Sequence, residues 1–505
     1  MDSALTMKPV DARNSLIYFS ILTALVIAVF RGPLTFLIGN LATIAVALPM
    51  GVLFFLIDWR KALPALRRPE VIGAIALIAW AAIKIPFSDS LWRGALGFAH
   101  LAFPVGAYLV FLALMTSARL RPSQHLQIAV IVSTILCAGV AVEVYFDQPL
   151  SSLVQHRTPA DVAAIFAPFR VGSFIGASLP FGVVLGLLLP FAIVAAVRLP
   201  NLLHILLVIA FLPMIVATYG RGAMMQAGVA GLAIAALLLV NRWTTPSDQR
   251  RQYSKPSVSY AAGVTVAIIT ILPFMYGAIP NSISARFESG IVSVCRVASL
   301  AEACSSIVSL QTYDDSDSAS TCDTVLEVTS RRGDDVDADA LYDRCMQAAA
   351  EGLDVSSISR FEVYNAMFAY MDTWPKRLFG GSLMASGNFV KYFNFDYLIP
   401  GVEASESYYL KLYTEVGIVG LVVFLALMIF IIGCGCVLAF KRPKTAWNFI
   451  GIASSAALVG LAPEMLFLQS LENPVVAIIF GWVMAVGAYS WRQNGEGDDG
   501  TADVL

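Results

Sequence analysis

One arginine lies where a long apolar run begins, in the stretch ATYGRGAMMQAG, residues 217–228. Arg221 could extend its charged end to a membrane interface. It could also bind an anion, because the helix expected after it would turn its first free N–H groups and its positive dipole end toward the same point. Gly220 and Gly222 would let a bulky anion approach the backbone. The sequence leaves both interpretations open and makes Arg221 a candidate anion ligand.

A second arginine, Arg360, opens the stretch SRFEVYNAMFAYMDTWPKRLFGG. Apolar residues recur there at helical spacing, and Pro375 is expected to end the helix that they form. Packing explains these residues, but it does not explain a cation at the positive dipole end of a helix, which is unfavourable unless an anion joins it. The apolar stripe comprises Phe361, Tyr364, Met367, Phe368 and Met371.

Carboxylates stand at the start of another apolar run, in EASESYYLKLYTEVGIVGL. Ionisable groups that enter a membrane span are costly and are often functional. Glu406 and Glu415 are nine residues apart, about two and a half helical turns, so they project in opposing directions. Only one of them is expected to face a given site. The tyrosines nearby, including Tyr408, are typical of a belt at the membrane interface.

Composition determines the class of protein that must position these groups. Of the 505 residues, 58% are hydrophobic and 13% are charged, and the mean hydropathy is +0.74. A soluble globular protein carries roughly twice that charged fraction. We therefore predict an integral all-α membrane protein that is surrounded by the lipid bilayer and has no nucleic-acid partner. No small-residue cleavage site follows the first apolar run, so we interpret it as a retained span.

A span needs about 20 mostly apolar residues, and the chain offers twelve candidates. They divide it into nine spans in residues 1–279, a large loop at 280–407, three spans in 408–491 and a tail at 492–505. The candidate spans are 15–31, 34–57, 71–87, 94–116, 126–146, 172–197, 201–219, 222–240, 258–279, 408–440, 446–468 and 473–491.

Lysine and arginine bias predicts the orientation. If both termini are cytoplasmic, the inner segments hold seventeen of the thirty-three Lys and Arg residues. Outside the 280–407 loop, the outer connections then hold only a few, among them Arg170 and Arg221. Lys84, near the outer end of the third span, is expected to extend to the interface. We predict that the loop and the candidate anion ligands face the periplasm.

The long loop contains an acidic insert. Residues 288–354 hold fourteen Asp and Glu against four Arg. An even set of cysteines in an oxidising compartment predicts two disulfides, whose pairing stays open. A metal site is the alternative for the same thiols, but the spacing has no C-x-x-C pair and no histidine lies nearby, so we expect no metal. The four cysteines are Cys295, Cys304, Cys322 and Cys345.

Four pieces in order resemble the superfamily of O-antigen ligases and Wzy-type polysaccharide polymerases, which are glycosyltransferases of the bacterial inner membrane. They are YGRGAMMQAG, ARF at Arg286, the stretch after Arg360, and ESYYLKLYTEVGIVGL. The resemblance covers residues 205–440 and extends to the twelve-span layout with a large outer loop. It implies a GT-C-like fold, a glycan donor carried on undecaprenyl diphosphate, and no cofactor or metal.

Residue by residue, the resemblance implies that Arg221 and Arg360 bind the diphosphate. Guanidinium suits this role because it holds phosphate oxygens bidentately and stays charged. Ligases usually carry a histidine where this chain has Glu406. That departure favours a polymerase, in which Glu406 would act as the base for the attacking hydroxyl. If attack is a single displacement, the anomeric configuration inverts.

Further residues are candidates for substrate binding, each with a simpler alternative. His100 lies inside the fourth span, where a histidine is a functional hypothesis by default, although hydrogen-bonded packing also explains it. Arg286 and Arg170 could guide an anionic substrate or only meet solvent. Tyr408 and Lys411 flank the proposed base.

Other function classes compete with a polymerase. A ligase would transfer the glycan to lipid A core or another acceptor. A lipid-linked sugar flippase is a transporter with a similar span count, but such proteins are usually built from two similar halves, and no repeat relates residues 1–240 to 258–491. For the polymerase, the growing glycan is the expected acceptor. A flippase and a chain-length co-polymerase are the expected partner proteins.

Overall fold

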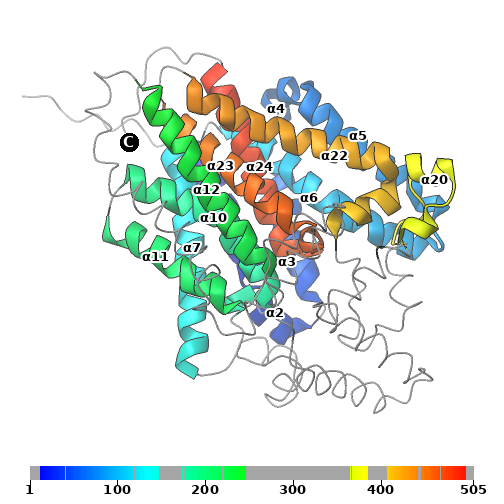
Figure 1. Cartoon of the computed structure of the whole chain (residues 1–505), viewed down its shortest axis with the longest axis horizontal. Coiled ribbons are helices and arrows are strands. Elements are labelled where there is room, and N and C mark those ends of the chain that lie inside the picture. The colour runs from blue at the N-terminus through cyan, green and yellow to red at the C-terminus, as the bar shows by residue number, and fades with distance from the viewer. Residues whose placement is uncertain are drawn as a thin grey trace, which may run out of the picture.

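The structure is a computed structural model that describes residues 12–39, 41–118, 120–146, 172–175, 177–199, 201–218, 221–245, 364, 367–384, 407–441, 445–466 and 468–495. Within these residues every regular element is helical. The principal helices are α1 (Ala12–Val29), α2 (Arg31–Ile38), α3 (Leu41–Phe55), α4 (Trp59–Leu66), α5 (Pro69–Lys84), α6 (Leu91–Ala118), α7 (Pro122–Phe146), α10 (Ser178–Arg198), α11 (Leu202–Ala217), α12 (Arg221–Trp243), α20 (Trp374–Phe379), α22 (Tyr408–Phe440), α23 (Ala446–Glu464) and α24 (Pro474–Gly495) (Figure 1).

Short 3₁₀ turns complete the described elements: η1 (Ile85–Phe87), η2 (Ser173–Ile175) and η4 (Ser470–Glu472). Among the described residues, nine helices are long and apolar enough to cross a membrane, or ten if a bent pair counts as one span. The predicted all-α polytopic fold is confirmed. The nine are α1, α5 with η1, α6, α7, α10, α12, α22, α23 and α24.

Two predicted spans differ from the structure. The expected span at 34–57 is not one straight helix, because α2 ends before Gly39, which has a positive φ of 58°, and α3 begins only at Leu41. After this span, the chain bends by 97° from α3 into α4. The expected span at 201–219 corresponds to α11, whose 16 residues are fewer than a straight crossing needs. The predicted span at 258–279 lies outside the described residues.

Three helices form the centre of the bundle. In α10 and α24, 89% of the best apolar window is buried inside the protein, and in α23 the share is 78%. Trp482 of α24 is fully buried and its ring lies 5.0 Å from that of Phe191 in α10. Hydrogen bonds from small polar side chains join these helices, as where Ser454 Oγ donates to the Val483 carbonyl at 2.8 Å. In lipid, packing and such bonds hold helices together, because apolar surface gains little by leaving lipid.

The outer helices expose large apolar side chains. Examples are Phe19 of α1, Leu48 of α3, Ile72 of α5 and Ile209 of α11, each more than half exposed. If this apolar surface were exposed to water, the protein would tend to aggregate. The same surface suits contact with lipid chains, so the burial pattern agrees with a multi-pass membrane protein.

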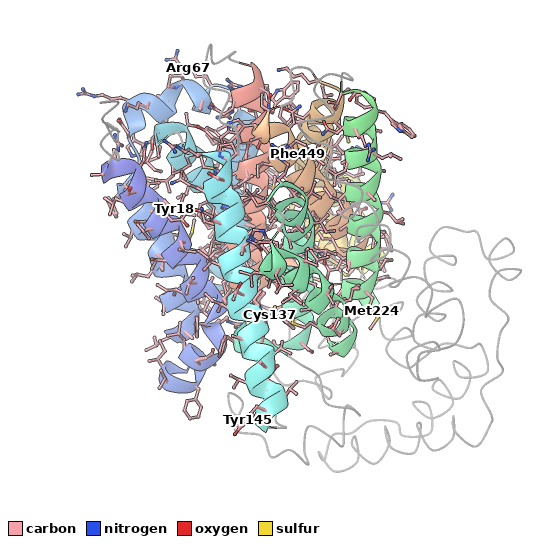
Figure 2. The ribbon with its side chains drawn as sticks, turned by 90° about the vertical axis from the view of Figure 1, so that its left-hand side faces the viewer. Tyr18, Arg67, Cys137, Tyr145, Met224 and Phe449 are labelled. Carbon is pink, nitrogen blue, oxygen red and sulfur yellow. The ribbon has the colours of Figure 1, made fainter. Side chains whose placement is uncertain are left out.

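Helix ends that the sequence assigns to one side lie together. Figure 2 shows Arg67 at one end of the bundle and Tyr145 at the other. At the Arg67 end, Arg492 donates to Glu70 at 3.0 Å, and both side chains are nearly inaccessible. Arg13 donates to Asp58 there at 2.9 Å. We call the Arg67 end the inner end and the Tyr145 end the outer end, following the predicted orientation.

Candidate functional site

A break in α22 shapes the outer end. Gly417 has a φ of 75°, so the helix interrupts its regular turns there. Gly380, just after α20, also has a positive φ of 82°, and the backbones of the two glycines meet so closely that a Cβ on either would collide with main-chain atoms of the other segment. Only glycine fits both conditions. In Figure 1, α20 lies against the outer part of α22.

Polar contacts hold this junction. Gly381 N donates to the Thr414 carbonyl at 2.7 Å, and Trp80 Nε1 donates to the Val416 carbonyl at 3.2 Å. Lys84 is buried and its ammonium donates to the Gly380 carbonyl at 2.8 Å. The expectation that Lys84 extends to the interface is therefore wrong, because the Gly380 carbonyl at this junction offers its ammonium a closer partner. The junction fixes the direction in which the outer part of α22 points.

The described segment before this junction agrees in part with the predicted amphipathic helix. Met367 and Met371 are fully buried, whereas Phe368 is 55% exposed. Pro375 does not end that helix, because the chain leaves it earlier and α20 begins at Trp374 with the proline in its first turn. Proline is favoured there, where its missing N–H costs nothing.

Outside the spans, an ion pair joins α20 to Asp372, which precedes it in the chain. Lys376 donates to Asp372 at 2.9 Å, and that hydrogen bond, with the nearby positive charge, lowers the pKa of the Asp372 carboxyl from its ordinary value. Both side chains are well exposed to solvent.

The outer part of α22 carries a buried cluster of charges. Lys411 hydrogen-bonds to Glu472 of η4, and its Nζ lies 3.5 Å from Glu415 Oε1. The Lys411 and Glu415 side chains are 1% and 0% exposed. His100 of α6 approaches from the other side, with Nδ1 3.8 Å from Glu472 Oε2. We call Lys411, Glu415, Glu472 and His100 the outer-end cluster.

Within the outer-end cluster, two carboxyl groups and one imidazole surround the Lys411 ammonium. The half-buried His100 and Glu472 are its more accessible members, with side chains 30% and 18% exposed. The Glu472 carboxyl can accept a hydrogen bond from a sugar hydroxyl, and the imidazole can donate or accept one.

The turn η4 connects this cluster to the start of α12. Ser470 Oγ donates to Glu464 Oε2 at 2.6 Å, while Glu464 Oε1 has no hydrogen-bond partner among the described residues. Glu464 lies beside Gly222, since a Cβ added to that glycine would lie 3.2 Å from Glu464 Cγ. A buried carboxylate thus stands next to the first turn of α12, which begins at Arg221.

The structure brings together only some of the predicted site residues. Lys411 and His100 both contact Glu472. Tyr408 is buried, with its ring 5.5 Å from that of Phe424, and its backbone N donates to the Met465 carbonyl. Arg221 is the first residue of α12, but its side chain lies outside the described atoms. Also outside the described residues are Arg170, Arg286, Arg360, Glu406, Cys295, Cys304, Cys322 and Cys345.

Sequence reasoning did not select Glu464 and Glu472. Both stand in LAPEMLFLQSLENPVV, between two apolar runs. Carboxylates at that depth are a signal that could have identified them. Among the described residues, no group of three or more His, Cys, Asp and Glu side chains could hold a metal ion.

The fold and this site define a polytopic, all-helical membrane protein with a buried polar cluster at one end of its bundle. A family model described as O-antigen ligase matches residues 205–425, and this match confirms the resemblance to the superfamily of O-antigen ligases and Wzy-type polymerases. It supports a ligase or polymerase type of function in O-antigen biosynthesis and a glycosyltransferase-like activity. No curated protein matches the chain significantly.

Proposed function

We propose that this protein polymerises oligosaccharide repeat units carried on undecaprenyl diphosphate, at the periplasmic face of a bacterial inner membrane. The observation that carries the proposal is the family match over residues 205–425, which spans Arg221, Arg286, Arg360 and Glu406 in one stretch. The geometry supports it: α12 begins at Arg221 beside a polar cluster where a saccharide could bind.

In this mechanism the arginines bind the donor diphosphate. Arg221 and Arg360 neutralise the charge that grows on the leaving group as the glycosidic bond to phosphate breaks. Preorganised donors aimed at growing charge are often the largest single catalytic contribution. The first free N–H groups of α12 add to the same anion site. The donor lipid leaves as undecaprenyl diphosphate.

In this proposal the acceptor is the growing glycan chain. Glu406 takes the proton of its attacking hydroxyl. His100 and Glu472 bind neighbouring hydroxyls of the saccharide, because a partly exposed carboxylate and an imidazole offer the acceptor and donor atoms that sugars need. Lys411 and Glu415, being buried, position Glu472 and do not meet the sugar.

A ligase is the second candidate, because the matching family model is described as O-antigen ligase. Glu406 favours the polymerase, since ligases of the superfamily usually carry a histidine there. The two activities act on the same donor and differ in the acceptor, which is a second lipid-linked glycan in one case and lipid A core in the other.

Deleting the gene and analysing the glycans separates these functions. Loss of a polymerase leaves surface glycan of single repeat units, whereas loss of a ligase leaves long polymer on undecaprenyl diphosphate and none on the lipid A core. Complementation with the wild-type gene is the control. Long lipid-linked polymer in the deletion strain would reject the polymerase.

A second experiment separates an enzyme from a flippase. Purified protein in detergent is given lipid-linked repeat units, with no membrane for transport to cross. A polymerase converts them to longer glycans and releases undecaprenyl diphosphate. Unchanged donor, combined with transport in vesicles, would favour the flippase.

A further inference from the structure

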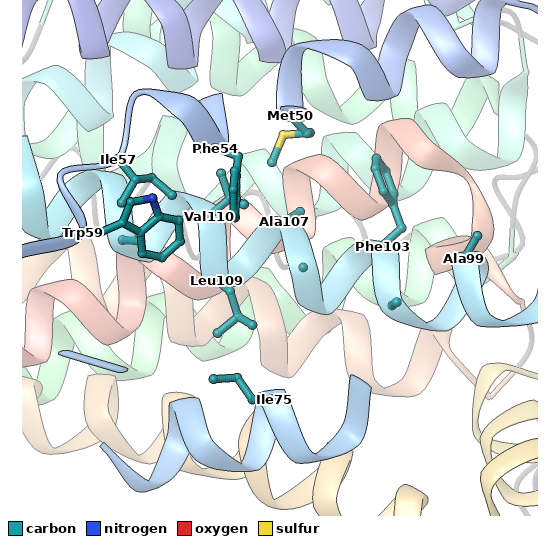
Figure 3. A pocket seen from close by; sticks show the side chains of 13 residues that line it. Met50, Phe54, Ile57, Trp59, Ile75, Ala99, Phe103, Ala107, Leu109 and Val110 are labelled. Carbon is teal, nitrogen blue, oxygen red and sulfur yellow. The ribbon is translucent and has the colours of Figure 1, made fainter. Parts of the chain in front are cut away.

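An apolar groove runs along α6 on the side facing α3 and α5. Its volume is about 500 Å³. Met50 and Phe54 of α3, and Ile57 and Trp59 at the bend into α4, form one wall, and a face of α6 from Ala99 to Ala113 forms the floor (Figure 3). Except for the Trp59 indole, no lining side chain bears a hydrogen-bonding group.

The groove lies at membrane depth. The stretch from Ala99 to Ala113 extends about 21 Å along the helix axis, which is roughly two thirds of the hydrocarbon thickness. Its floor belongs to a helix that is long and apolar enough to span the membrane. Water is a poor occupant of an apolar space at that depth. A hydrocarbon chain suits both the lining and the shape.

Basic side chains stand at the Trp59 end of the groove. Trp59 lines the groove and also begins α4, the helix that bends by 97° away from α3. The next residues on α4, Arg60 and Lys61, are exposed, while Ala62 and Ala65 pack inward. Asp58 reduces the local positive charge, since it pairs with Arg13 and lies 3.8 Å from Lys61 Nζ.

The positive charge on this face still exceeds the negative charge. Arg67 follows α4 and is exposed at the inner end, where Figure 2 labels it. Glu70, the next acidic residue in the chain, accepts a hydrogen bond from Arg492. Arg60, Lys61 and Arg67 together therefore form a positive face beside the apolar groove.

We propose that this groove binds one acyl chain of an anionic phospholipid, whose phosphate contacts Arg60 and Lys61. Basic residues at the membrane surface attract anionic lipid head groups, and the adjoining groove supplies apolar contact for the chain. The lipid chain of the proposed donor fits less well, because its diphosphate would lie near Arg221 at the outer end. This lipid site is thus separate from the outer-end cluster.

The test measures lipid binding directly. Full-length protein in detergent, stripped of lipid, is titrated with dioleoylphosphatidylglycerol or dioleoylphosphatidylcholine, and bound lipids are counted by native mass spectrometry. Gly106 lies on the groove floor, and a Cβ added there would meet nothing within 4 Å. Gly106→Leu therefore fills the groove without a clash at the Cβ.

The matched control is Gly51→Leu on α3. Gly51 also faces open space but does not line the groove. A second variant, Arg60→Ala with Lys61→Ala, removes the head-group contacts at exposed positions and leaves the helix packing intact. Circular dichroism confirms that each variant keeps its helix content.

We expect wild-type protein to bind the anionic lipid more tightly than the zwitterionic one. Gly106→Leu should weaken phosphatidylglycerol binding about tenfold by excluding several methylene groups. The double variant should weaken it about 25-fold, from about fivefold for each lost charge, and Gly51→Leu should bind as wild type does. Wild-type affinity in Gly106→Leu, equal affinity for both lipids, or displacement of phosphatidylglycerol by equimolar undecaprenyl phosphate would each overturn the proposal.

Discussion

At the scale of single residues, Lys411 is the most constrained charge in the site. Its ammonium lies between Glu472 and Glu415, and the Lys411 side chain is only 1% exposed to solvent. Removing one member of a buried group of charges leaves the others without compensation, which typically costs about 3–5 kcal/mol. An exposed pair costs far less to break, usually under about 1 kcal/mol.

The first prediction compares Lys411→Met with Lys376→Met. The second lysine pairs with Asp372 at an exposed position, so it is a matched control. Lys411→Met should lower the thermal unfolding temperature in detergent strongly, whereas Lys376→Met should change it little. Adding Glu472→Gln to Lys411→Met should restore part of the loss, because one of the two orphaned charges is removed. Equal, small shifts for both lysines would contradict the buried cluster.

The second prediction concerns Arg221 and its place at the start of α12. Under the proposed function, Arg221→Ala should reduce polymer formation by about 10²–10³-fold, the usual cost of one charge-stabilising donor. Arg242 is in the last turn of the same helix and faces the opposite end, so Arg242→Ala is the control. Gel analysis of surface glycans measures both, with membrane insertion checked by immunoblot. Normal polymer from Arg221→Ala would remove this arginine from the site.

The third prediction separates chemistry from binding at Glu406. Glutamine keeps the size of the side chain but cannot take a proton. Glu406→Gln should therefore lower kcat while KM for the lipid-linked donor changes little. Measurement of both parameters with purified protein tests this. An unchanged kcat would exclude Glu406 as the base.

At the scale of elements, the junction of α20 with α22 depends on two glycines at positive φ. The fourth prediction is that Gly417→Ala detaches the segment around α20, because a Cβ there would collide with the carbonyl of Leu378. Limited proteolysis should then cut within residues 372–384 sooner than in wild type. Gly433→Ala, in the same helix with open space at its Cβ, should behave as wild type. Equal proteolysis rates for both variants would show that the junction tolerates a side chain.

A helix could be predicted from the sequence where its own residues determine it. Spans such as α6, α10 and α24 were predictable because a membrane crossing requires a long apolar run, and such a run is visible in the sequence. The break at Gly39 and the break at Gly417 were not, because the apolar run continues on both sides of each glycine. The break at Gly417 depends on a partner that is distant in sequence, the backbone of Gly380.

The candidate site shows the same limit. The sequence indicated His100 and Lys411 by their charge at membrane depth, but it could not indicate that both contact Glu472. Lys411 and Glu472 are 61 residues apart, and their contact depends on how α22 and α24 enter the bundle. The packing of helix ends depends on tertiary structure. Individual members of a polar cluster can therefore be predicted from the sequence, but the contacts between them cannot.

At the scale of the whole molecule, orientation follows from which helix ends lie together. Contacts join Arg492 to Glu70 and Arg13 to Asp58 at one end, and Lys411 to Glu472 at the other. These groupings agree with the sides that lysine and arginine bias assigns. Because the ends are fixed relative to one another, the orientation of a single connection sets that of all the described ends.

The fifth prediction tests that orientation with single cysteines in a variant whose native cysteines are replaced by serine. Ser90, between η1 and α6, and Arg67, after α4, are exposed at opposite ends. In spheroplasts, a membrane-impermeant maleimide should label Ser90→Cys at once, and Arg67→Cys only after detergent is added. The reverse pattern would place the outer-end cluster in the cytoplasm, where a donor diphosphate facing the periplasm could not reach it, and the proposed polymerase would then be wrong.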